Sequence, residues 1–190
     1  MDAIELLLKR VSVPRLQEPA PTAEQLEIML RAALRAPDHG QLRPWRFLTI
    51  AGDNRKQLGE LFVQAVLSTE PNASFEQIEK TRNLPMRAPM LLVVIASVSK
   101  DPKVPAHEQL LAAGCAAHGV LLAAHALGVG AVWRTGAMAE LDMVNTGLGL
   151  QDNEQIIAYI YLGTPINSLR NPPLLDPADF VRSWPEKTPS

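Results

Sequence analysis

Apolar residues recur along this chain with helical spacing in some segments and as short continuous runs in others. A helix is predicted after Thr22, because Thr22 and Gln25 have the spacing of a capping box. The apolar residues that follow share one helical face: Leu26, Met29, Leu30, Ala33 and Leu34. Asp2 and Ser74 are capping residues that predict two further helices, and helical stripes also occur near residues 58–66, 107–127 and 139–145.

The apolar run at residues 90–98 is rich in β-branched side chains and too short for a typical solitary helix. Such a run is typical of a strand covered on both faces, so we expect it in the middle of a sheet. Shorter strands are expected at residues 46–50, 131–133 and 156–162. Three prolines within residues 12–21 predict an extended crossing instead of a helix. The pattern as a whole predicts an α+β fold around a single sheet.

The composition limits the classes of function. The chain has 190 residues, 47% hydrophobic and 20% charged, with a formal net charge of -2. This indicates one globular domain without the basic excess that nucleic-acid binding requires. The single cysteine, Cys115, cannot build a disulfide framework, and the N-terminus does not read as a secretory signal, so we expect a cytoplasmic protein. Residues 110–133 lack charged side chains, but their alanine and glycine content predicts a buried helix running into a strand, not a membrane span.

Arginines near the first two predicted helices are the first candidate for binding chemistry. Arg10 and Ser12 follow the first helix, Arg15 lies just beyond, and Arg31 and Arg35 lie on the second. Guanidinium groups bind phosphate through paired hydrogen bonds, and a serine hydroxyl adds a donor. The set is compatible with a cofactor phosphate site and also with a solvated surface, which is common for exposed arginines.

Two other segments combine turn-forming residues with potential ligand contacts. In the loop at residues 37–45, His39 can donate a hydrogen bond, Gly40 permits close backbone approach and Trp45 can form one wall of a pocket. The alternative is a simple turn with a packed tryptophan. Residues 128–136 include Trp133, Arg134 and Thr135, which a strand end can present to a ligand. A dinucleotide fingerprint is rejected there, because a tryptophan takes the third glycine position and a helix precedes the motif.

Metal and nucleophile chemistry have weaker support in the sequence. His118 and His125 are seven residues apart with Cys115 nearby, but their apolar neighbours favour core histidines over a zinc site. No nucleophile elbow, Walker loop or paired-carboxylate pattern stands out. We therefore expect no metal site and nominate no catalytic acid or base.

Four motifs, taken in order, resemble the nitroreductase family, and within it the small single-domain members of the YdjA type. They are Arg10-Val-Ser12 with Arg15, Arg35-Ala-Pro-Asp-His39 leading to Pro44-Trp45, Gly-Val-Gly-Ala-Val-Trp133-Arg-Thr, and Tyr161-Leu-Gly-Thr-Pro165. The resemblance covers residues 1–165, which would form one FMN-binding domain. Residues 166–190 would be a proline-rich extension that packs on the body or on a partner subunit, with Phe180 and Trp184 as possible anchors.

The resemblance implies a mostly antiparallel sheet flanked by helices, in an intertwined homodimer with FMN at the interface. By position, the phosphate end of FMN would be held by Arg10, Val11 and Ser12 of one subunit, and Arg35 and His39 would contact FMN from the other. Trp133, Arg134 and Thr135 would frame the flavin. NADH or NADPH would reduce the flavin, which would then reduce nitroaromatic, quinone-like or related small acceptors in a ping-pong reaction.

The chain departs from the family pattern at two positions. Val11 stands where the family often has a second arginine, and Gly40 stands where relatives commonly have a polar residue. Three other functions remain open: a family member specialised in dehalogenation or double-bond formation, a flavin-binding or sensory protein without useful turnover, and a purely structural dimer. The sequence does not indicate whether NADH or NADPH is the donor.

Overall fold

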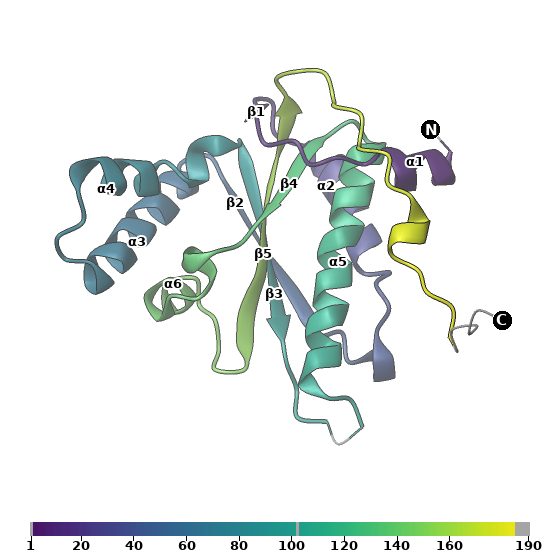
Figure 1. The fold of residues 1–190 in the computed structure, drawn as a ribbon. Coiled ribbons are helices and arrows are strands. Elements are labelled where there is room, and N and C mark those ends of the chain that lie inside the picture. Colours follow the sequence, from purple (N-terminus) through teal and green to yellow (C-terminus); the bar gives the residue numbers. More distant parts are fainter. Residues whose placement is uncertain (1, 102, 185–190) are drawn as a thin grey trace.

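A computed structural model of the chain describes residues 2–101 and 103–184. Figure 1 shows a central sheet with α3, α4 and α6 on one side and α2 and α5 on the other. The strands are β1 (Leu16–Gln17), β2 (Trp45–Ala51), β3 (Met90–Ser97), β4 (Gly130–Arg134) and β5 (Glu154–Pro165). The helices are α1 (Ala3–Lys9), α2 (Ala23–Ala33), α3 (Asn54–Thr69), α4 (Phe75–Arg82), α5 (Ala106–Ala126) and α6 (Asp142–Gly147). The α+β prediction is confirmed.

Every strand pair in the sheet is antiparallel. β5 pairs with β3 along one edge and with β4 and then β1 along the other, while β2 pairs with β3. The prediction that residues 90–98 form an interior strand is confirmed, because β3 lies between β2 and β5. β5 is longer than the predicted strand at 156–162. The extended crossing predicted from the prolines contains the short strand β1.

The capping signals in the sequence predict three helix starts correctly. The Asp2 carboxylate accepts a hydrogen bond from the Glu5 amide at 2.8 Å, and the Ser74 hydroxyl accepts one from the Gln77 amide at 3.2 Å. Thr22 begins α2 with a complete capping box. The start predicted at residue 139 is wrong: Ala137–Ala139 is a 3-10 turn (η3), and Leu141 is extended, so α6 begins only at Asp142.

The two faces of the sheet have separate hydrophobic cores. On one face, Leu58 and Phe62 of α3 pack with the strand residues Leu91, Val93 and Tyr159. On the other face, α2 and α5 cover Leu92, Val94 and Ile160. Adjacent strand residues point to opposite faces, so β3 takes part in both cores. α2 and α5 approach closely because Gly119 has no side chain: a Cβ there would lie 3.0 Å from the Ala32 carbonyl oxygen.

α5 is the one described helix that is long and apolar enough to cross a membrane, but half of its most apolar window is buried inside the molecule. It packs against the sheet and α2, as the core-helix prediction requires. Its outer face is exposed, including Leu111, Cys115 and His118. The expectation that both histidines belong to the core is therefore wrong for His118, while His125 is half-buried.

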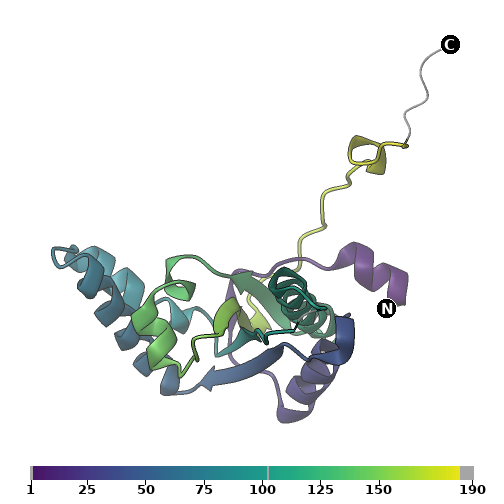
Figure 2. The ribbon, with the colours of Figure 1, turned by 90° about the horizontal axis from the view of Figure 1, so that it is seen from below.

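The chain ends expose many apolar side chains. α1 has the predicted apolar stripe, yet Ile4, Leu7 and Leu8 are 65%, 58% and 70% exposed. Figure 2 shows α1 and residues 167–184 projecting from the same side of the body. Phe180 and Trp184 on this segment are 72% and 95% exposed. Neither therefore anchors the extension to the body of its own chain.

One ion pair fastens β2 to the start of β5. The Glu154 carboxylate, whose side chain is 5% exposed, accepts hydrogen bonds from Arg46 Nε at 2.7 Å and Nη2 at 2.6 Å. Hydrogen bonding by Arg46 holds the pKa of Glu154 below its ordinary value of 4.5. A carboxyl group with a lowered folded-state pKa contributes stability above pH 4.5, and this contribution is lost as the pH falls through the folded-state pKa.

We predict that Glu154→Gln lowers the free energy of unfolding at pH 7 by about 1–3 kcal/mol, because it weakens hydrogen bonds to a charged partner. The wild type should lose stability more steeply than the variant below pH 4.5, so that the two curves converge. Urea unfolding between pH 3 and 8 measures both effects. Glu76→Gln, at an exposed carboxylate on α4, is the control. Parallel pH curves for wild type and Glu154→Gln would contradict the prediction.

Candidate functional site

The first predicted binding segment lies against the beginning of the C-terminal extension. Residues 11–15 and 167–170 line a hollow of about 180 Å³, which we call the tail hollow. Its polar groups include Ser12, Arg15 and Arg170, and no carboxylate lines it. These groups make the tail hollow suitable for an anion such as a phosphate.

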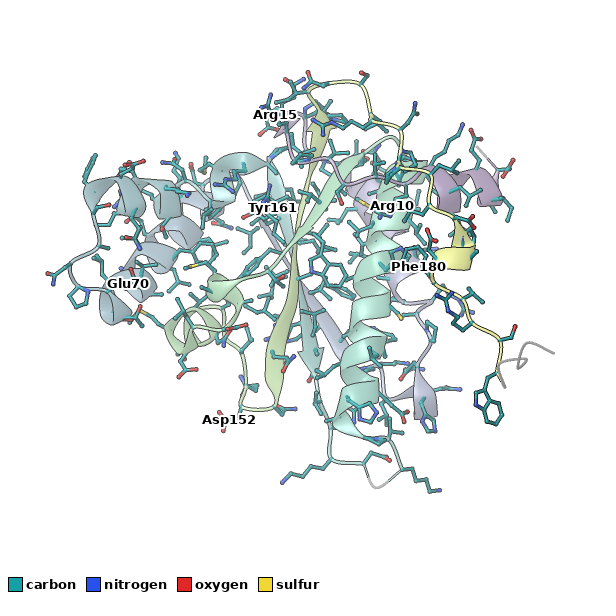
Figure 3. The ribbon with its side chains drawn as sticks, viewed as in Figure 1. Arg10, Arg15, Glu70, Asp152, Tyr161 and Phe180 are labelled. Atoms are coloured by element: carbon teal, nitrogen blue, oxygen red, sulfur yellow. The ribbon has the colours of Figure 1, made fainter. Side chains whose placement is uncertain are left out.

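Arg10 lies beside the tail hollow at the end of α1. It is the C-cap of α1 and is half-buried. Burial, together with the charge of Arg10, lowers the pKa of His125 in the last turn of α5. The two residues are therefore close, and both effects favour the neutral form of His125. Figure 3 shows Arg10 near this end of α5, with Arg15 nearer the end of β5.

Arg35 lines a second hollow, of about 420 Å³, which we call the loop hollow. Its other lining residues are Leu34, Ala36, Asp38, Gln41, Arg43 and Trp45. The loop has an unusual backbone: Gly40, Gln41 and Arg43 have φ values of 72°, 53° and 50°. Side chains are unfavourable in this region, and such conformations concentrate at ligand sites. The Asp38 carboxylate stabilises the loop by accepting a hydrogen bond from the Arg43 backbone amide at 2.8 Å.

His39 is held by a residue that sequence analysis missed. His39 Nδ1 lies 2.7 Å from Oε2 of Glu108, in the first turn of α5. An ionised carboxylate can only accept hydrogen bonds, so His39 Nδ1 carries a hydrogen and donates a hydrogen bond to Glu108. The other ring nitrogen, Nε2, is then available to a ligand. His39 and Glu108 are 69 positions apart, and no local pattern relates them.

Trp133 and Arg134 are adjacent on β4 and point to opposite faces of the sheet. Trp133 packs toward α5, where a Cβ at Gly114 would lie 4.0 Å from its ring. Arg134 lies over the ring of Tyr161, 5.7 Å from the centroid. Arg134, Thr135, Arg87 and Tyr161 contribute to a third hollow of about 430 Å³, the arginine–tyrosine hollow. Burial raises the pKa of Tyr161, and the charges of Arg134 and Arg87 oppose that rise.

The outer edge of β4 connects the tail hollow to the arginine–tyrosine hollow. The Val13 amide donates to the Ala131 carbonyl at 2.8 Å, so residues 11–15 begin alongside β4. The amide and carbonyl groups of successive strand residues point alternately to the two neighbouring edges. Trp133, two residues after Ala131, therefore also directs its amide and carbonyl away from β5. In residues 2–101 and 103–184 this outward pair has no backbone partner. An elongated ligand can therefore lie along this edge.

The arginines near the hollows lack the ion pairs that four other arginines make. Arg31, Arg46, Arg55 and Arg82 each have a glutamate within 4.0 Å. Within the described part of the chain, none of the following has a carboxylate partner: Arg10, Arg15, Arg35, Arg87, Arg134 and Arg170. Including Arg31 in the candidate basic set was wrong, because it pairs with Glu27 at 2.8 Å one helical turn away.

The predicted residues occupy three separate hollows of one chain. Val11 and Ser12 line the tail hollow, with Arg10 beside it, while Arg35 lies in the loop hollow near His39. Trp133, Arg134 and Thr135 all line the third hollow, together with Arg87 and Tyr161. Sequence analysis did not single out Glu108, which contacts His39, or Arg87 and Arg170, which line two of the hollows. The described residues contain no group of three or more metal-ligating side chains.

Sequence comparison places the chain among proteins of known family. A model of the "Nitroreductase family" matches residues 7–164. The chain is 41% identical over 182 residues to the protein named "Putative NAD(P)H nitroreductase YdjA" from Escherichia coli K12, covering 95% of this chain and 98% of the relative. A Haemophilus influenzae protein with the same name, apart from the suffix, is 40% identical over 185 residues with the same coverage.

Solved structures have the same fold at lower identity. A nitroreductase-like family protein from Bacillus cereus superposes with a TM-score of 0.82 at 19% identity, covering 97% of each chain. A nitroreductase with bound FMN from Bacteroides fragilis has a TM-score of 0.69 at 20% identity, covering 93% of this chain and 95% of that one. The nitroreductase-like fold expected from the motifs is confirmed.

We predict that Glu108→Ala loosens the loop around His39 without unfolding the protein. The side chains of His39 and Glu108 are 60% and 37% exposed, and such pairs contribute about 0.2–1 kcal/mol. Amide hydrogen exchange at residues 38–43 should therefore accelerate by about 1.5- to 5-fold, with almost no change in global stability. His107→Ala, at the exposed neighbouring position, should not alter exchange. Unchanged exchange in Glu108→Ala would show that Glu108 does not hold the loop.

Proposed function

Because this chain belongs to the nitroreductase family, we propose that it is a cytoplasmic FMN-dependent oxidoreductase that uses NADH or NADPH to reduce nitroaromatic, quinone-like or related small acceptors. The names of its relatives and the fold it shares with an FMN-bound nitroreductase support this proposal. The observation on which it rests most is the group of arginines in the tail hollow and the arginine–tyrosine hollow that have no carboxylate partner among the described residues.

These residues fit the two ends of FMN. Arg10, Ser12 and the Val11 backbone would hold the phosphate in the tail hollow, and Arg15 and Arg170 add charge there. Arg170 of the C-terminal extension would thus replace the charge of the arginine that is missing at position 11. Arg134 Nε is buried without a hydrogen-bond partner in the described chain, as expected of a donor positioned for a polar ligand.

The open edge of β4 fits the middle of the cofactor. Strands rise about 3.3 Å per residue, so Ala131 and Arg134 are separated by about 10 Å along β4. A ligand that reaches both hollows must be at least this long, and FMN is. Bound FMN would supply the hydride-transfer chemistry between NAD(P)H and the acceptor, and the protein would position the reactants. Trp133, Arg134 and Thr135 would hold the flavin end of FMN.

A second subunit would complete the site. Arg35 and His39 share no hollow with Arg10 or Arg134 in one chain, so we place them against FMN from the partner in an intertwined homodimer. The exposed apolar side chains of α1 and the outer face of α5 support this assignment, since large exposed apolar surfaces are typical of interfaces. We also propose that the C-terminal extension packs on the partner subunit.

The first test is an absorbance spectrum of the purified protein, recorded before and after anaerobic addition of NADH or NADPH. We expect flavin bands that bleach with the nucleotide and return when a nitroaromatic acceptor is added. Yellow protein that oxidises NAD(P)H only at background rate would favour a flavin-binding or sensory role. Colourless protein that stays colourless after incubation with FMN would contradict the cofactor assignment.

The same measurement tests the phosphate site with a matched pair of arginine variants. Arg10→Ala should weaken FMN retention by about 1.5–3 kcal/mol, the range for a hydrogen bond to a charged group. Arg31→Ala removes an equal charge from an arginine already paired on the surface of α2, so it should retain FMN normally. Equal retention in both variants would remove Arg10 from the site.

We predict that the α1 stripe lies in the dimer interface. The double variant Leu7→Glu/Leu8→Glu should convert the dimer into monomers and release FMN, because it places charges on a face that the partner would cover. Phe75→Glu, at a 79% exposed position on α4, should remain dimeric. Sedimentation equilibrium measures the mass of each variant. A wild type that is monomeric while holding FMN would contradict the dimer.

A further inference from the structure

Glu108, in the first turn of α5, contacts one nitrogen of the His39 ring and leaves the other free. We propose that Glu108 is a positioning residue for cofactor binding: it keeps the hydrogen of the neutral His39 ring on Nδ1, so that Nε2 accepts a hydrogen bond from FMN. The inference rests on the proposed function, which places His39 against FMN held by the partner subunit. It adds a residue outside the family motifs and assigns His39 to the ribityl chain or ring of FMN, not to its phosphate.

The chemistry of the pair fixes the direction of its hydrogen bond. Glu108 Oε2 lies 2.7 Å from His39 Nδ1, and an ionised carboxylate has no hydrogen to donate. A neutral imidazole has one N–H and one acceptor nitrogen, and the partner of one nitrogen decides the state of the other. Within the described residues Nε2 makes no hydrogen bond, so it is left as an acceptor on a side chain that is 60% exposed.

An acceptor nitrogen distinguishes the parts of FMN. A fully ionised phosphate offers only acceptor oxygens. The ribityl chain has hydroxyl groups and the flavin ring has an imide N–H, and these groups can donate. Nε2 of His39 therefore matches the ribityl chain or the ring, whereas the guanidinium groups of the tail hollow match the phosphate.

The next residue on α5 fixes a second loop that lies beneath His39. Gln109 is 1% exposed, and its side-chain oxygen accepts a hydrogen bond from the Ser99 amide at 2.9 Å. Its side-chain nitrogen donates to the carbonyls of Ser99 and Val104 at 2.9 and 3.0 Å. A buried polar group whose hydrogen bonds are all satisfied holds its partners in one arrangement. Gln109 therefore fixes Val104 relative to α5.

Val104 in turn packs against the backbone beside His39. Val104 is 4% exposed, and a Cβ on Gly40 would lie 3.3 Å from its Cγ2. Gly40 has a φ of 72°, so a side chain there would be both crowded and strained. This contact gives a physical reason for a glycine where relatives commonly have a polar residue. Glu108 and Gln109 thus hold the His39 ring and the adjoining backbone from one helix.

The first test determines the state of His39 by nitrogen NMR of the purified protein with isotope-labelled histidine, at mildly alkaline pH, where an imidazole is neutral. The His39 signals are identified by their loss in His39→Ala. In the wild type, Nδ1 should carry the hydrogen. In Glu108→Ala the hydrogen should move toward Nε2, whereas Glu108→Gln, which keeps an acceptor oxygen, should preserve the wild-type state. Glu24→Ala, which removes a carboxylate from the first turn of α2, is the control.

The second test measures the affinity for FMN by fluorescence titration. Glu108→Ala should weaken FMN binding by about 1.5- to 5-fold, the range for an exposed pair. Riboflavin, which has no phosphate, should lose the same factor. In the His39→Ala background, Glu108→Ala should have no further effect, because the residue through which it acts is gone. Glu108→Gln should restore most of the affinity, and Glu24→Ala should bind FMN normally.

The two tests separate failure of this inference from failure of the proposed function. A wild type that binds FMN but carries the hydrogen on His39 Nε2 would overturn the inference alone, and so would unaltered FMN affinity in Glu108→Ala. An equal loss of affinity with and without His39 would assign Glu108 a purely structural role. A loss seen with FMN but not with riboflavin would assign His39 to the phosphate. A wild type that binds neither flavin would contradict the proposed function, and the inference would fall with it.

Discussion

The pairing of β5 with three other strands positions the whole candidate site. Its residues 159–162 lie between β3 and β4, and its last two residues pair with β1. The contact with β1 joins segments more than a hundred positions apart, so its cost in chain entropy must be offset by burial. Ile160 and Leu162 are fully buried, and the cores on both faces depend on this strand. A slip of one residue would move Tyr161 to the opposite face and dismantle the arginine–tyrosine hollow.

Arg46 and Arg134 differ in whether the chain itself provides a partner for their charge. Arg46 is engaged by Glu154, and the pair fastens one end of the sheet. Arg134 lies in the same sheet, but no carboxylate compensates it within the described residues, and its Nε is buried without an acceptor. A buried donor without a partner reduces stability. Its retention is best explained by a ligand that accepts its hydrogen bond.

The features that could be predicted from the sequence are those determined by neighbouring residues. The capping contacts of Asp2, Thr22 and Ser74 involve residues only three positions apart, so the helix starts follow from local chemistry. The partnership of His39 with Glu108 depends on how α5 packs beside the loop, and no spacing rule encodes it. The same applies to Arg87 beside Arg134, which only the strand order brings together. The family motifs identified one member of each pair, and the structure supplies the other.

The apolar stripe of α1 shows why a periodic pattern predicts a helix but not what covers it. The spacing of Ile4, Leu7 and Leu8 indicates one buried face, and the helix forms as predicted. Yet this face is exposed in the isolated chain, because the helix follows the edge of the molecule instead of the sheet. The helical spacing of apolar residues indicates that one face of the helix is to be buried. The same spacing is found whether that face packs against the same chain or against another chain. Since Arg10 ends this same helix, a partner that covers the stripe would also order the proposed phosphate site, and dimerisation would then be coupled to cofactor retention.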